Sequence, residues 1–135
     1  MFYFAYGSNL HHQQMKRRCS DSIFIKKFIL ENHLLTFRSP YKVADINEKK
    51  GSFVPGALYE ISKSDEKKLD RYEDYPILYK KKYFKINNMK IMTYFMNSNS
   101  SFKYPSTKYL NTIIQGYKDC NLDKNYLFKI LMKKF

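Results

Sequence analysis

The order in which strand-like and helix-like segments follow one another is the feature that most constrains the fold of this chain. Runs rich in β-branched and aromatic residues recur through residues 1–96, interrupted by two helical patterns, and two more helical patterns complete the chain. Strands and helices do not alternate regularly, which disfavours a parallel doubly wound sheet. We therefore expect an α+β fold, with a mostly antiparallel curved sheet or a small β-barrel and flanking helices.

Local signals place the expected elements. Ser8 or Asn9 is a suitable N-cap for the first helix, and Ser62 followed by Asp65 marks the start of the second. Asn87-Asn88 favours a hairpin turn, Pro55-Gly56 indicates a strand edge or bulge, and Gly116 is expected to end a helix. We expect strands at 2–6, 22–30, 33–39, 43–47, 52–61, 79–86 and 89–96, and helices at 11–18, 64–73, 106–116 and 123–134. The polar segment 97–105 is expected to be a mobile loop.

Length and cysteine content indicate the broad class of protein. A chain of 135 residues buries one core, so we expect a single domain over 1–135. Cys19 and Cys120 make neither a disulfide framework nor a metal set. No apolar run approaches the ~18 residues that a membrane span needs, and Phe2 to Tyr6 is too short for a signal peptide. The sequence predicts a soluble cytoplasmic protein with reduced cysteines.

The formal net charge of +13 has two interpretations. A basic surface can bind nucleic acid, but arginine is the usual residue for phosphate recognition, and only four of the 25 basic residues are arginine. Lysine, asparagine, isoleucine and tyrosine are all abundant, as an AT-rich genome would favour. We therefore interpret the charge first as composition bias, and expect no nucleic-acid partner.

Two stretches of the sequence contain residues suited to binding or catalysis. The turn Tyr6-Gly7-Ser8-Asn9, between a strand and a helix, leaves backbone N–H groups free for a carboxylate, phosphate or developing oxyanion. Such turns are commonly only caps. The second is Asp70-Arg71-Tyr72-Glu73-Asp74, where the aromatic neighbours of Glu73 would raise its pKa by desolvation and suit it to proton transfer. For a glutamate taken at random, a solvated helix end is the better interpretation.

Four blocks, in order, resemble the γ-glutamylcyclotransferase-like family. YFAYGSNL followed by QM and RRC resembles its opening, and VADI with VPGALYEIS resembles its next segment. LDRYEDYPILY resembles the block with the family's acidic residue, and PSTKYLNTIIQGYKDCNL resembles its C-terminal block. The likeness extends from about residue 3 to residue 127. Asp74 stands where members often have glycine, and Ser20 where they often have proline.

The resemblance implies the release of an amine from a γ-glutamyl group by closure of that group to 5-oxoproline. The substrate's α-amine attacks its own γ-carbonyl, so no protein nucleophile, metal or cofactor is implied. Glu73 matches the residue that moves the proton, and the Gly7–Asn9 backbone would hold the oxyanion or the substrate carboxylate. Tyr79 and Tyr109 match pocket tyrosines, with core packing as the alternative. The implied substrate-binding residues are Tyr6, Gly7, Ser8, Asn9, Leu10, Tyr79 and Tyr109.

Several alternatives stay open at the level of sequence. The substrate can be a small γ-glutamyl amino acid or amine, γ-glutamyl-ε-lysine, or a γ-glutamyl-protected biosynthetic intermediate. A glutathione-specific enzyme is less favoured, because that branch matches only at the turn and the acidic residue. A non-catalytic binding module, acting on nucleic acid through the lysines, is the alternative from another class. We expect the 97–105 loop to form the leaving-group pocket, and oligomeric state, a homodimer included, is not readable.

Overall fold

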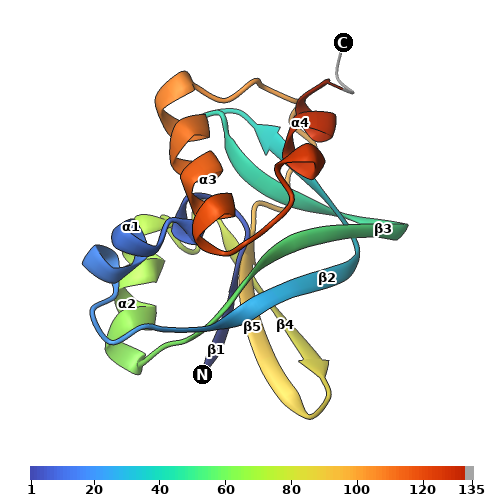
Figure 1. The fold of residues 1–135 in the computed structure, drawn as a ribbon. Coiled ribbons are helices and arrows are strands. Elements are labelled where there is room, and N and C mark those ends of the chain that lie inside the picture. The colour runs from blue at the N-terminus through green and yellow to red at the C-terminus, as the bar shows by residue number, and fades with distance from the viewer. Residues whose placement is uncertain (133–135) are drawn as a thin grey trace.

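The computed structural model describes residues 1–132 and shows an α+β fold with one mixed sheet (Figure 1). The N-terminal strand lies inside the sheet, with helices placed around it. In chain order the elements are β1 (Phe2–Ala5), the 3-10 turn η1 (Ser8–Leu10), α1 (His12–Arg18), β2 (Ile23–Arg38), β3 (Val43–Glu60), α2 (Lys63–Tyr72), β4 (Lys80–Ile86), β5 (Met89–Phe95), α3 (Thr107–Asp119) and α4 (Lys124–Met132). No helix within residues 1–132 is long and apolar enough to cross a bilayer.

The sheet is open, with strand order β2-β3-β1-β5-β4. Neighbouring strands pair antiparallel except for β1 and β5, which run parallel with Phe2 opposite Ile91 and Tyr3 opposite Met92. β2 and β4 form the two edges, so the expected α+β class is confirmed in its open-sheet form rather than as a barrel. Because β1 lies between β3 and β5, the turn that follows it starts from the middle of the sheet.

The segments expected as four separate strands merge into two long ones. β2 and β3 pair from Arg38↔Val43 to Ile23↔Glu60, and the irregularity between Glu31 and His33 is a bulge rather than an end. Asn32 and Gly51 have φ of 60° and 82°, and the Gly51 N–H donates to the Asn32 side chain at 3.1 Å. The residues that were expected to form turns lie at this bulge instead. The hairpin is continuous, because β2 and β3 are paired on both sides of the bulge.

Pro55 lies in this hairpin opposite Ile29. The β1 ladder on the other side of β3 covers only residues 57–60, so Pro55 lacks a β1 partner at its own position. β3 is an inner strand, but on its β1 side it is unpaired at Pro55, so the expected edge is found only at this position.

Helix starts show where local signals sufficed and where they did not. Ser62 and Asp65 form a reciprocal capping box at the start of α2, as the sequence predicts. The expected cap of the first helix was wrong: His11 caps α1, its Nδ1 accepting from the Gln14 N–H at 3.1 Å. Ser8 and Asn9 belong instead to the 3-10 turn. Asn87 and Asn88, with φ of 50° and 65°, make the expected β4–β5 turn.

Gly116 does not end α3, which continues to Asp119. A Cβ at this position would lie 2.5 Å from the Leu10 Cβ and 2.7 Å from the His11 nitrogen. Glycine is present because the helix backbone packs directly on the turn after β1. α4 begins one residue later than expected, and the expected helical positions Lys133 and Lys134 lie outside the described residues.

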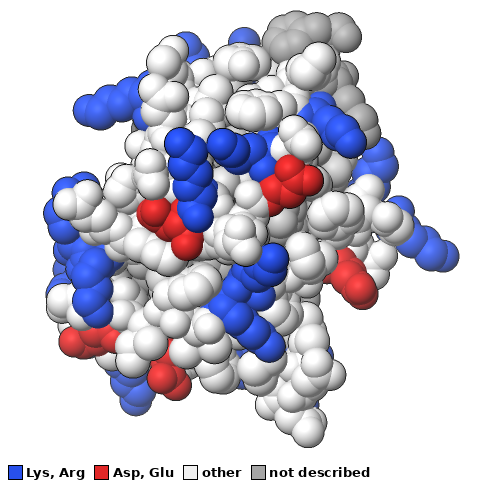
Figure 2. Space-filling view, viewed as in Figure 1, with Lys and Arg blue, Asp and Glu red and all other residues white. Residues whose placement is uncertain are grey.

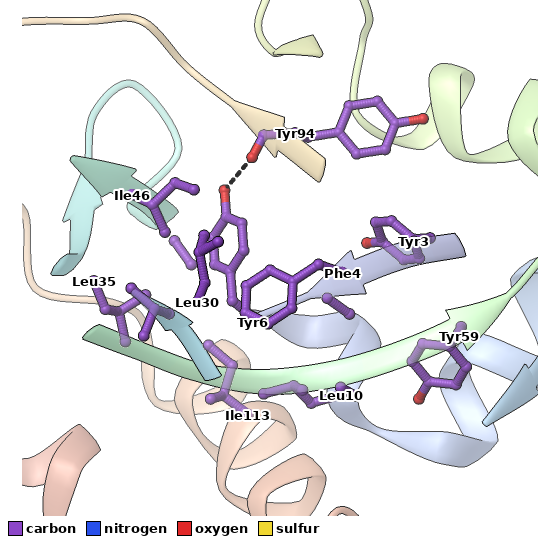
Figure 3. Close-up of a cluster of buried hydrophobic side chains, with 14 of the residues drawn as sticks. Tyr3, Phe4, Tyr6, Leu10, Leu30, Leu35, Ile46, Tyr59, Tyr94 and Ile113 are labelled. Carbon is purple, nitrogen blue, oxygen red and sulfur yellow. Dashed lines mark hydrogen bonds between the residues drawn. The ribbon is translucent and has the colours of Figure 1, made fainter. Parts of the chain in front are cut away.

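The core joins the sheet to α3 and fixes the end of β1. Figure 3 shows Leu10 of the turn and Ile113 of α3 on one side of the buried cluster. The Tyr6 hydroxyl points to β5 and donates to the Tyr94 carbonyl at 2.7 Å (Figure 3). Tyr6, before Gly7, is therefore held by β5, whereas Leu10, after Gly7, is held by α3.

Candidate active site

The turn after β1 presents backbone to a cavity. Its own hydrogen bonds run from the Leu10 N–H to the Gly7 carbonyl at 3.0 Å and from the His11 N–H to the Ser8 carbonyl at 3.2 Å. The N–H groups of Ser8 and Asn9 precede these donors and are not used by the turn itself. A Cβ on Gly7 would lie 3.2 Å from the Ala44 Cβ and 3.3 Å from the Tyr109 hydroxyl, so the fit around this residue is tight.

Arg18, at the end of α1, holds the turn from the side. Its Nη1 donates to the Asn9 Oδ1 at 2.7 Å and to the Ser8 Oγ at 3.2 Å. Asn9 is buried, and its Nδ2 donates to the Tyr3 hydroxyl at 3.0 Å. The two polar side chains of the turn are thus committed to orienting it.

Glu73 caps the C-terminus of α2, and its backbone N–H bonds to the Leu69 carbonyl at 2.8 Å. No side chain or N–H group within residues 1–132 hydrogen-bonds to its carboxyl group. Burial raises the pKa of Glu73 to about 7, and the Arg18 charge opposes this only in part. Near neutral pH the group is therefore divided between acid and carboxylate, as a proton carrier requires.

These features surround one cavity of about 400 Å³. Seven of its lining residues are tyrosines, so much of its wall is aromatic. The turn after β1 lines the cavity together with the C-terminus of α2. The lining residues are Tyr3, Tyr6, Gly7, Ser8, Asn9, Arg18, Tyr41, Val43, Ala44, Tyr72, Glu73, Asp74, Leu78, Tyr79, Tyr94 and Tyr109.

Tyr79 and Tyr109 have a structural role as well as lining the cavity. The Tyr79 hydroxyl donates to the Ala44 carbonyl at 2.6 Å, and the Tyr109 hydroxyl accepts from the Ala44 N–H at 3.0 Å. The hydroxyl proton of Tyr79 is therefore already donated to Ala44 and is not free for a ligand. Tyr109, like Tyr3, only accepts in these bonds, so both keep a hydroxyl proton that can be donated to a ligand.

The residues that the sequence singles out mostly meet here. Six of the seven expected binding residues line the cavity with Glu73, whereas Leu10 does not. The Leu10 side chain is fully buried in the core and packs against α3 at Gly116. Its match to the family block thus reflects a packing position that holds the turn.

Residues 97–105, where we expect the leaving-group pocket from the sequence, lie apart from the residues that line the Glu73 cavity. None of these residues lines the Glu73 cavity within the described part of the chain. The Arg38 guanidinium donates to the Ser100 carbonyl, and the Lys103 N–H donates to the Phe37 carbonyl at 2.9 Å. These bonds attach the segment to the end of β2, an edge strand of the sheet.

Nine of the cavity residues were not among the site residues expected from the sequence, and two of these nine are polar groups beside Glu73, namely Arg18 and Asp74. Arg18 is part of the RRC stretch, so the signal was present, but a basic residue in a chain with 25 of them did not stand out. Asp74 has φ of 50°, a left-handed conformation that glycine adopts without strain. That conformation accounts for the glycine often found at the matching position. Within residues 1–132, no three His, Cys, Asp or Glu side chains gather in a way that could hold a metal ion.

Comparison with known proteins agrees with this geometry. The family model described as γ-glutamyl cyclotransferase, AIG2-like, matches residues 3–111. A solved γ-glutamyl cyclotransferase has a TM-score of 0.82 at 24% identity, over 96% of this chain and 85% of that one. The human uncharacterised protein loc79017 has a TM-score of 0.80 at 25% identity, over 96% and 85%. YkqA from Bacillus subtilis has a TM-score of 0.78 at 20% identity, over 99% of this chain and 53% of its own.

No curated protein matches the chain. The family match includes the turn after β1, the end of α2 and Tyr109, which are the parts that meet at the cavity. The chain therefore belongs to the AIG2-like γ-glutamyl cyclotransferase family.

Proposed function

We propose that this protein is a γ-glutamyl cyclotransferase that converts the γ-glutamyl group of small γ-glutamyl amino acids or amines to 5-oxoproline and releases the free amine. The observation that carries the proposal is Glu73, a carboxyl group without a hydrogen-bond partner among the described residues, in a cavity opposite the turn after β1. A cytoplasmic location is part of the same proposal.

The reaction needs a folded substrate and a moving proton. The α-amine of the glutamyl group attacks the γ-carbonyl carbon, a C–N bond forms, and the bond to the leaving nitrogen breaks. The α-nitrogen loses two protons, one before it attacks and one as the ring closes, and the leaving nitrogen gains both and departs as an ammonium group. Glu73 carries these protons from one nitrogen to the other, so it ends the cycle as it began. Holding amine and carbonyl in contact supplies much of the rate, because effective molarities of well-oriented groups reach ~10⁵–10⁸ M.

Charge on the substrate can be matched by groups on the cavity wall. The N–H groups of Ser8 and Asn9 suit the developing oxyanion or the α-carboxylate, and the Arg18 guanidinium suits the same carboxylate. The free hydroxyl protons of Tyr3 and Tyr109 add two further donors. These assignments require no cofactor.

The test is release of 5-oxoproline from a panel of γ-glutamyl dipeptides, γ-glutamyl-ε-lysine and glutathione. We expect the wild type to turn over members of the panel and Glu73→Gln to lose about 10²–10⁴-fold in rate, because the amide cannot carry the proton. Glu66→Gln is the matched control, since Glu66 lies on the same helix, bonds to Lys81 and does not line the cavity.

The pH dependence provides a second readout. With a Glu73 pKa of about 7, wild-type kcat/KM should rise as pH increases through that value, because the carboxylate is the form that accepts the proton. A folded Glu73→Gln protein that turns over substrate at the wild-type rate would overturn the mechanism. Absence of release from the whole panel would favour an unusual γ-glutamyl metabolite or the binding-module alternative.

A further inference from the structure

We infer that a basic cavity beside the Glu73 cavity binds an anionic group on the leaving amine, so that the preferred substrates are γ-glutamyl conjugates of acidic amines. This inference rests on the proposed function and names its substrate class. The anionic group is a carboxylate or a phosphate on the amine that is released.

The basic cavity lies between α1 and α2 and has a volume of about 430 Å³. It is lined by Arg17, Arg18, Lys68, Arg71 and Tyr72. Three of the four arginines in the sequence meet here, although arginine is the rarer basic residue in this chain. Figure 2 shows basic side chains gathered at the edge of the molecule beside α1.

These cations are not neutralised by neighbouring carboxylates. None of the ion pairs within residues 1–132 includes Arg17, Arg18, Lys68 or Arg71. Glu66 and Asp70, also on α2, both bond instead to Lys81 of β4, at 2.8 and 3.1 Å. The helix thus directs its central carboxylates to one side and its free cations to the other.

Two further acidic residues, at the start of α2 and in the turn after α1, are also occupied. Asp65 accepts from the Ser62 and Asp21 N–H groups at 3.2 and 3.3 Å, and Asp21 accepts from the Ser62 hydroxyl at 2.8 Å. These contacts serve the start of α2. The excess positive charge of the basic cavity therefore remains available to a ligand.

The two cavities adjoin, because Arg18 and Tyr72 line both of them. The Arg18 guanidinium carbon lies 4.4 Å from the centre of the Tyr72 ring, so the shared wall is a cation–π pair. A γ-glutamyl unit at Glu73 can extend its leaving portion past this wall. Since residues 97–105 do not line the Glu73 cavity, the basic side offers the charged route outward.

Guanidinium groups favour carboxylate and phosphate, which accept two parallel hydrogen bonds from one arginine. Arg17 and Arg71 are exposed, so each contributes modestly, roughly two- to fivefold in affinity for an anion. Added salt should weaken this preference, because exposed charges are screened.

The experiment compares matched substrates that differ only in charge. γ-Glutamyl-alanine is paired with γ-glutamyl-alaninamide, and γ-glutamyl-phosphoethanolamine with γ-glutamyl-ethanolamine. We expect the wild type to show higher kcat/KM for an anionic member, and the pair with the larger ratio distinguishes carboxylate from phosphate. In Arg17→Gln/Arg71→Gln this ratio should fall about fivefold or more.

Lys63→Gln/Lys67→Gln is the control, since it removes the same charge from exposed positions of α2 that do not line the basic cavity. We expect it to keep the wild-type ratio. Absence of a preference in the wild type, or an unchanged ratio in the arginine variant, overturns the inference.

Failure of the proposed function is distinguished by measuring binding without turnover. Dissociation constants of the four conjugates are measured by calorimetry with Glu73→Gln, alone and combined with Arg17→Gln/Arg71→Gln. If an anionic conjugate binds more tightly than its neutral partner, and the arginine substitutions abolish this difference, the basic site is supported even if the wild type releases no 5-oxoproline. Equal or undetectable binding of all four conjugates overturns it.

Discussion

Two carboxyl groups near the same stretch of β3 have opposite surroundings. Asp45 is 1% exposed, and both of its oxygens are bonded: Oδ2 accepts from the Arg38 Nε at 2.8 Å, and Oδ1 from the Met96 N–H at 2.8 Å. The Glu73 side chain is half-buried among tyrosines, its carboxyl group has no hydrogen bond within residues 1–132, and its pKa is raised to about 7.

The difference separates a structural carboxylate from one that remains available for chemistry. Asp45 and Arg38 tie β2, β3 and the segment after β5 together, with Asn47 and Ser100 completing the contacts of Arg38. Glu73 contributes no such contact through its side chain, so its desolvation is not compensated by the fold. The following variants test this comparison, from the largest expected effect to the smallest.

Asp45→Asn should lower the free energy of unfolding by about 3–5 kcal/mol, because it leaves the buried Arg38 without its counter-charge. Urea denaturation measures the change. Glu48→Gln is the control, since Glu48 forms an exposed pair with Lys82 at 3.1 Å and should cost less than about 1 kcal/mol. Equal losses in the two variants would contradict the structural role of Asp45.

Glu73→Gln should stabilise the protein in a pH-dependent way. Below pH 4.5, the ordinary pKa of this group, the carboxyl is protonated in both states and the variant should match the wild type. Between pH 4.5 and about 7 the unfolded state ionises first, so wild-type stability falls as pH rises.

At pH 8 the variant should therefore exceed the wild type by on the order of 1–3 kcal/mol. Denaturation at pH 4 and pH 8 gives the two differences. A constant difference between the two pH values would show that the Glu73 carboxyl is not desolvated in the folded state.

Gly7→Ala should reduce kcat/KM for γ-glutamyl substrates roughly tenfold, because the new methyl group pushes on Ala44 and on the Tyr109 hydroxyl. Steady-state kinetics measures the loss. Gly51→Ala is the comparison: it places a methyl group in open space far along the β2–β3 hairpin, so only its positive φ is disturbed. An unchanged rate in Gly7→Ala would mean that the turn tolerates displacement.

Asp74→Gly should change stability by less than about 1 kcal/mol and leave the fold intact, because glycine adopts the φ of 50° freely. Asp74→Val should be less stable than Asp74→Gly, since a β-branched residue resists this conformation. Thermal unfolding of the pair ranks them. Equal melting temperatures would argue against a left-handed residue after Glu73.

Local chemistry accounts for what the sequence could predict. The Ser62–Asp65 capping box and the Asn87-Asn88 turn depend on residues a few positions apart, and both were correct. The four blocks of family resemblance indicated the cavity residues without their distances. Tyr79 and Tyr109 proved to be both cavity wall and braces for Ala44, which no local pattern distinguishes.

Long-range packing accounts for what the sequence could not predict. Gly116 looked like a helix end, but it allows α3 to approach Leu10, more than a hundred residues away in the chain. The placement of residues 97–105 depends on Arg38 in β2. Arg18 was missed because its hydrogen bond to Ser8 and its charge near Glu73 follow from its position in the fold rather than from its residue type.

The place of β1 inside the sheet has a consequence for folding. Phe4 pairs with Leu58 of β3, and Tyr3 pairs with Met92 of β5. Both partner strands of β1 are therefore synthesised much later than β1 itself. Contacts between distant segments slow folding, because loop closure comes before any gain from pairing. A nascent chain that ends before β5 therefore lacks one of the two strands that hold β1, and with it the turn at Gly7, in place.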